Sequence, residues 1–71
     1  MRFRLQVRVD CDDVGSRVTV RRRLEDGRLG DVLGILEDCD ERSFRVRDRR
    51  GEINVILRSE VVAAKVVEPP A

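Results

Sequence analysis

Apolar and polar residues alternate over several short stretches of the chain, and this spacing is typical of half-buried β-strands. Residues 3–9 form the first stretch, in which every second residue is apolar. The same spacing recurs at residues 17–21, 43–47 and 53–57. We therefore predict a strand in each of these four segments.

Polar turns separate the alternating stretches. Two aspartates precede Gly15 in the segment 11–15, which suits a tight helical turn. Gly27 supplies a positive-φ position in the turn at residues 25–28, and residues 48–52 form a hairpin loop. Short strands with turn signals at intervals of about 8–12 residues predict an all-β barrel or sandwich. At this length a five-stranded, SH3-like barrel is the economical architecture.

Two further segments fit more than one element. The apolar run 32–36 matches one face of a helix with Asp31 as N-cap, but it also matches a strand. In a strand, Gly34 would mark the bulge or bend that a small barrel needs to close. Residues 61–67 fit either a short helix opened by Ser59 or a 3-10 turn followed by a last strand.

The chain length of 71 residues allows one domain. We assign residues 1–67 to a single SH3-like barrel and the proline-containing residues 68–71 to a linker or tail. No apolar run approaches the roughly 20 residues that cross a bilayer, and the start of the chain lacks the apolar region of a signal peptide. We therefore expect a cytoplasmic protein that does not bind membranes.

Only two cysteines are present, Cys11 and Cys39, and they can form at most one disulfide. A secreted scaffold of this size would carry several. The sequence has no histidine and no CxxC pair, which excludes the usual Cys/His zinc site from one chain. We expect both cysteines to be buried or half-buried free thiols.

The residues that usually carry chemistry are scarce. Histidine, tyrosine and tryptophan are missing, and with them the usual general base and most nucleophile–base pairs. The acidic stretches 12–13 and 38–41 lack the ligand pattern of a calcium loop and are interpreted as solvated turns. Phe3 and Phe44 are assigned to the core, which leaves no aromatic groove for a proline-rich ligand. We expect no catalytic residue, cofactor or metal.

Arginine supplies 14 of the 15 basic residues, against 14 acidic ones, so the net charge is only +1. A local basic patch would arise if the arginines at positions 21 and 23 adjoin those at positions 45–50, and it would bind RNA or DNA weakly and in a salt-sensitive way. Alternatively, each arginine pairs with a nearby acid on a solvated face. The candidate interaction surface consists of Arg21, Arg23, Arg45, Arg47, Arg49 and Arg50.

Three stretches together resemble a known family: GSRVTVRRRLEDGRLGDVLGILEDCDE (15–41), FRVRDRRGEINVI (44–56) and SEVVAAKVVEPP (59–70). They are similar to the SH3-like domain at the amino terminus of certain actinobacterial GNAT-family N-acetyltransferases. A mycobacterial member of that group is described as a histone acetyltransferase. The similarity covers residues 12–70, nearly the whole chain.

The resemblance implies a strand over residues 29–38 bent at Gly34, a 3-10 turn over 59–62 before the last strand, and that strand over 63–67. It also implies that a catalytic domain follows the barrel. This chain has no Arg/Gln-x-x-Gly-x-Gly/Ala stretch to hold the pyrophosphate of acetyl-CoA, so no catalytic residue is carried over.

The leading hypothesis is therefore a non-catalytic module that packs on or positions an acetyltransferase domain, in the same polypeptide or a neighbouring subunit. Two alternatives come from other classes of protein. One is a small barrel that binds RNA or DNA weakly through its arginines. The other is an oligomerisation module joined through exposed barrel edges, such as the predicted strand at residues 3–9.

Overall fold

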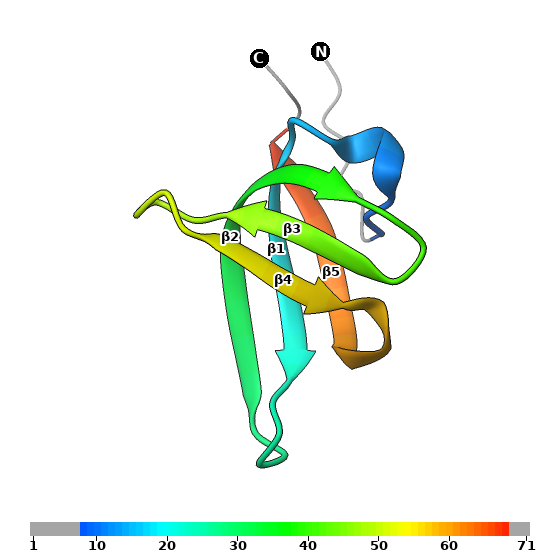
Figure 1. Cartoon of the computed structure of the whole chain (residues 1–71), viewed down its shortest axis with the longest axis vertical. Coiled ribbons are helices and arrows are strands. Elements are labelled where there is room, and N and C mark those ends of the chain that lie inside the picture. Colours follow the sequence, from blue (N-terminus) through cyan, green and yellow to red (C-terminus); the bar gives the residue numbers. More distant parts are fainter. Residues whose placement is uncertain (1–7, 69–71) are drawn as a thin grey trace.

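Five antiparallel strands form one curled sheet in the computed structural model, which describes residues 8–68 (Figure 1). The strands follow one another across the sheet in the order β4-β3-β2-β1-β5. This arrangement confirms the prediction of an all-β, five-stranded small barrel. The strands are β1 (Arg17–Arg23), β2 (Leu29–Cys39), β3 (Ser43–Arg47), β4 (Ile53–Leu57) and β5 (Val61–Glu68).

Two predictions concern the ends of the chain, which lie partly outside the described residues. The predicted strand at residues 3–9 is described only at Arg8 and Val9, which are not in a strand. Val9 is nevertheless buried in the core. The predicted linker is described only at Glu68, which is the last residue of β5.

The long strand β2 joins the two halves of the barrel. Its residues 29–35 pair with β1, and from residue 35 onward it pairs with β3. Gly34 lies where the pairing changes, and a Cβ added there would overlap the carbonyl oxygen of Arg47 and lie 2.8 Å from the carbonyl carbon. Because Gly34 has no side chain, β3 can approach β2 at its curved middle (Figure 1). The strand predicted over residues 29–38 is therefore confirmed, and the alternative of a helix is wrong. The register of β2 against β3 shifts between Leu36 and Asp38, beyond Gly34.

The core lies inside the curled sheet and follows the alternation along the strands. Val18 and Val20 point inward from β1, and Leu36 points inward from β2. Phe44 is buried as predicted, whereas Phe3 lies outside the described residues. The buried apolar residues are Val9, Val18, Val20, Leu36, Phe44, Val46, Ile56 and Val66.

Two short 3-10 helices complete the described chain. The predicted turn after residue 10 is η1 (Cys11–Asp13), where the Asp10 carboxylate accepts a hydrogen bond from the Asp12 N–H. The turn before the last strand is η2 (Arg58–Glu60), and β5 begins at Val61. The prediction of a 3-10 turn followed by a last strand is therefore confirmed, and the alternative of a short helix over residues 61–67 is wrong. Only the boundaries implied by the resemblance are wrong, because Val61 already pairs with Arg22 of β1.

Cys11 and Cys39 form a disulfide, so the expectation of free thiols is wrong. The fold supplies the reason, because η1 lies against the end of β2 and brings the two Cα atoms to 5.3 Å. That separation falls within the range that a disulfide spans. The sequence shows only that 28 positions separate the two cysteines.

Between residues 8 and 68, the only helical elements are single 3-10 turns, and none is long or apolar enough to span a membrane.

Candidate functional site

The six arginines of the candidate surface fall into two groups that do not adjoin. Arg23 pairs with Leu29, whereas Arg47 pairs with Ile35, six residues further along β2. At about 3.3 Å per residue, these positions are roughly 20 Å apart along the strand. Figure 1 shows the β1–β2 turn at the bottom of the molecule and the β3–β4 turn at its left side. The other members are Arg21 on β1, Arg45 on β3, and Arg49 and Arg50 in the β3–β4 turn.

Acidic side chains neutralise half of these arginines. Two hydrogen bonds of 2.9 and 3.3 Å join the Arg21 guanidinium to the carboxylate of Asp31 on the neighbouring strand. Arg45 and Arg47 also form ion pairs with carboxylates. Among residues 8–68, no carboxylate lies within ion-pair distance of Arg23, Arg49 or Arg50. The pairs are Arg45 with Asp38 (3.2 Å) and Asp40 (3.5 Å), and Arg47 with Glu37 (3.1 Å).

A row of apolar side chains on β4 faces solvent. Ile53, Val55 and Leu57 have exposed fractions of 44%, 54% and 47%. The pairing of Ile56 with the core residue Phe44 turns Ile56 inward and its neighbours outward. We call Ile53, Val55 and Leu57 the β4 face. The alternation placed these three residues together, but it could not tell which face of β4 meets the core.

The β4 face lies on a strand at the edge of the sheet, and local bonds hold that strand in place. The Asn54 side-chain amide donates to the Val46 carbonyl (3.3 Å) and to the Asp48 carboxylate (3.1 Å). The Arg22 side chain of β1 donates a hydrogen bond to the Val55 carbonyl at 3.4 Å. The β4 face is therefore an apolar surface on a fixed edge, and such edges favour contacts with another protein.

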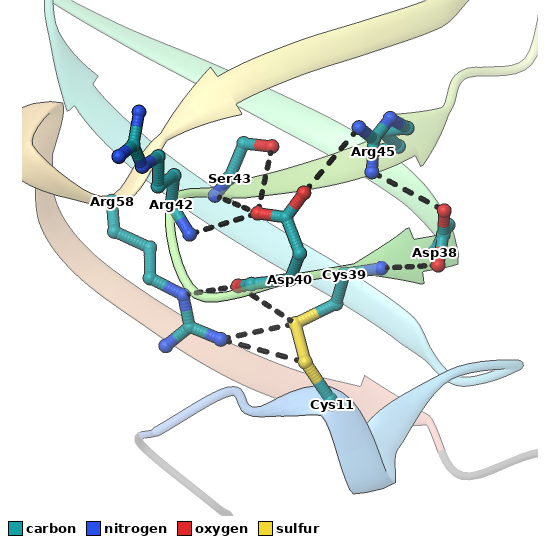
Figure 2. Close-up of polar contacts among 8 residues, drawn as sticks. All are labelled: Cys11, Asp38, Cys39, Asp40, Arg42, Ser43, Arg45 and Arg58. Carbon is teal, nitrogen blue, oxygen red and sulfur yellow. Dashed lines mark hydrogen bonds and ion pairs between the residues drawn. A yellow bond between two sulfur atoms is a disulfide. The ribbon is translucent and has the colours of Figure 1, made fainter.

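A second cluster joins η1, the β2–β3 loop and η2 around the disulfide (Figure 2). Arg58 Nε donates to the Asp40 carbonyl at 2.9 Å, and Arg58 Nη2 lies 3.0 Å from Cys39 Sγ and 3.5 Å from Cys11 Sγ. The guanidinium also lies over the Phe44 ring, 4.5 Å from its centroid. No local sequence signal marks Arg58, because its contacts come from three separate segments.

Two turn aspartates are held in their ionised form by hydrogen bonds. Asp40 accepts from the N–H groups of Arg42 and Ser43, both at 2.8 Å, and these bonds lower the pKa of its carboxyl. In the β3–β4 turn, the Asn54 amide and then the Glu52 N–H lower the pKa of Asp48. On β2, the hydrogen bond from Arg21 lowers the pKa of Asp31. These carboxylates stabilise turns and strand pairing.

Acid is therefore expected to destabilise the barrel. The carboxyl groups of Asp31, Asp40 and Asp48 have lower pKa values when folded than their ordinary value of about 3.9. At a pH near that ordinary value, the unfolded chain binds more protons than the folded chain. The free energy of unfolding therefore falls as the pH drops toward and below it. Urea titrations between pH 6 and 3 measure this directly. Equal stability at pH 6 and pH 3 would contradict it, and Asp48→Asn should flatten the decline.

No group of three or more histidine, cysteine or acidic residues in the described part of the chain is arranged to hold a metal ion.

Comparison with known families gives one match. A family model described as the Rv0428c N-terminal Sm-like domain matches residues 12–65. Those residues include all of β1 to β4, both 3-10 helices except Cys11, and most of β5. Comparisons with curated proteins and with solved structures gave no match.

Proposed function

The chain belongs to the family of Rv0428c N-terminal Sm-like domains, and from this premise we propose that it is a non-catalytic docking domain. Its β4 face packs on an acetyltransferase domain of the GNAT family, in the same polypeptide or in a neighbouring subunit. The observation that carries the proposal is the solvent-facing row Ile53, Val55 and Leu57 on an edge strand.

Two features favour a following domain as the occupant of this surface. The family description calls the matching domain N-terminal, which in the named protein places further chain after it. The resemblance of residues 12–70 to the amino-terminal domain of acetyltransferases points to the same order. Burying three aliphatic side chains that are about half exposed would then supply a small apolar centre for the interface.

The arginines support docking of protein more than binding of nucleic acid. Arg21, Arg45 and Arg47 are paired with carboxylates. Of the three with no carboxylate in reach among residues 8–68, Arg23 ends β1, whereas Arg49 and Arg50 lie in the β3–β4 turn. Figure 1 shows the end of β1 and the β3–β4 turn well apart. Nucleic-acid binding through the arginines stays a prediction. Fluorescence anisotropy with single-stranded RNA at about 50 mM salt tests it, and binding that weakens steeply with added salt would support it.

The docking proposal is tested with the 71-residue chain and a separately produced acetyltransferase domain of its own protein. Intact-mass measurement of the endogenous protein first establishes whether that domain is in the same polypeptide. Calorimetry then measures binding in trans. We expect Val55→Lys to weaken binding by at least about tenfold, because it places a charge in the apolar centre of the interface.

Leu33→Lys is the matched control. Leu33 is a 60% exposed aliphatic residue on β2, and its replacement introduces the same charge. We expect this variant to bind like the unmodified chain. Equal binding by the unmodified chain and Val55→Lys would refute docking through β4. A chain that self-associates in light scattering, with Val55→Lys monomeric, would instead identify a second copy as the occupant.

A further inference from the structure

We propose that the Cys11–Cys39 disulfide is a reversible thiol–disulfide exchange site that reacts with small-molecule thiols, with Cys11 as the attacked sulfur and Cys39 as the leaving group. This inference is independent of docking through β4. It rests on the unequal surroundings of the two cysteines, which differ in the exposure of the residue and in the charges near the sulfur.

Access favours attack at Cys11. Cys11 is exposed in η1, whereas Cys39 is half-buried at the end of β2. Exchange requires the incoming thiolate to reach one sulfur along the disulfide axis, and the more exposed residue, Cys11, offers the easier approach. Attack at Cys11 leaves Cys39 to depart.

Charge favours departure of Cys39. Arg58 Nη2 lies 3.0 Å from the Cys39 sulfur, and Arg58 is already fixed by the Asp40 carbonyl and the Phe44 ring (Figure 2). A neutral disulfide sulfur is a weak acceptor, but a thiolate at the same place would accept a charge-assisted hydrogen bond. The Cys11 sulfur is farther from Arg58 Nη2, at 3.5 Å, and Asp12 and Asp13 follow Cys11 with no ion-pair partner among residues 8–68, so their charges oppose a thiolate there. The acids on either side of Cys39, Asp38 and Asp40, are both paired with Arg45. Arg58 therefore stabilises the reduced pair more than the oxidised one.

The exchange is a balanced two-electron reduction. A small-molecule thiolate attacks Cys11 Sγ, a mixed disulfide forms on Cys11, and Cys39 leaves with the electron pair of the broken bond. A second thiolate attacks the small-molecule sulfur of the mixed disulfide. Cys11 then leaves as a thiolate, and the two small thiols depart as their own disulfide.

Reduction changes one corner of the molecule and leaves the strand ladder in place. The disulfide ties η1 to the end of β2. Separate backbone bonds, from the Gly15 N–H to the Leu36 carbonyl (2.8 Å) and from the Leu36 N–H to the Ser16 carbonyl (2.9 Å), hold the residues just before β1 against β2. Breaking the disulfide releases η1 without removing those bonds. The pair thus controls how firmly η1 is held at the end of β2.

The test uses glutathione redox buffers followed by acid quenching, alkylation and mass spectrometry. For Arg58→Met we expect the equilibrium to move about tenfold toward the disulfide, a shift of about 30 mV for two electrons. Arg42→Met is the matched control. Arg42 belongs to the same cluster, where its N–H donates to the Asp40 carboxylate, but its side chain makes no hydrogen bond to either sulfur (Figure 2). It should stay within twofold of the unmodified chain.

A second measurement needs no variant. With brief exposure of the oxidised, unmodified chain to glutathione, the trapped mixed disulfide is expected on Cys11 in large excess over Cys39. A mixed disulfide mainly on Cys39 would overturn the proposal. So would equal equilibria for Arg58→Met and Arg42→Met, or a native disulfide that glutathione does not reduce at any ratio of its reduced and oxidised forms.

Discussion

Gly34→Ala is expected to destabilise the barrel by about 3 kcal/mol, which in a domain of this size lowers the melting temperature by roughly 12–24 °C. The added methyl group would overlap the Arg47 carbonyl group, which is backbone and cannot rotate away. Relief therefore requires β2 and β3 to separate where the long strand changes partner. Thermal unfolding followed by circular dichroism measures the effect.

Gly30→Ala is the matched control in the same strand. The atoms nearest to a Cβ added at Gly30 belong to the Leu24 side chain, at 3.5 Å, which is an ordinary contact. We expect a change within about 1 kcal/mol in either direction, because the substitution also restricts the unfolded chain. Equal melting temperatures for the two variants would contradict the close approach of β2 and β3 at Gly34.

Removal of the disulfide is expected to have an effect of similar size. Cross-linking residues 28 positions apart restricts the unfolded chain, and the loop-entropy relation gives about 3.5 kcal/mol for that separation. The double variant Cys11→Ser, Cys39→Ser should therefore lose about 3.5 kcal/mol and keep the roughly 3–5 kcal/mol that the hydrophobic core of so small a domain supplies. Urea unfolding of the oxidised chain and of the variant gives the difference.

Reducing agent supplies the control for this prediction. It should lower the stability of the unmodified chain toward that of the double variant and leave the variant itself unchanged. A difference below about 1 kcal/mol between the oxidised chain and the variant would show that the bond does not constrain the chain as the fold implies.

The alternation of apolar residues was enough to predict β1, β3 and β4 and the class of fold, whereas β2 and β5 were assigned from the resemblance. Val18 and Val20 share the buried face of β1, as their spacing indicates, and Phe44 lies in the core. The segment around Gly34 remained ambiguous on local pattern, because a glycine between aliphatic residues fits a helix poorly and a flat strand poorly. Only the position of the Arg47 carbonyl, supplied by β3, explains why glycine is there.

The candidate sites depend on register and on contacts between distant segments, which alternation does not encode. Whether Val55 or Ile56 faces the core is decided by the pairing of Ile56 with Phe44. The disulfide and the position of Arg58 depend on η1, the β2–β3 loop and η2 meeting at one corner. The arginines were identified from the sequence as a group, but their pairing with acids across strands follows from the ladder.

Amide hydrogen exchange of residues 53–57, with and without the acetyltransferase domain, tests the docking of the β4 face most directly. Exchange at the free edge of β4 is expected to slow by at least about tenfold when the domain is added, while the β1–β2 turn at residues 25–28 exchanges at an unchanged rate. Unchanged exchange throughout residues 53–57, at domain concentrations where calorimetry shows the complex to be formed, would contradict docking through β4.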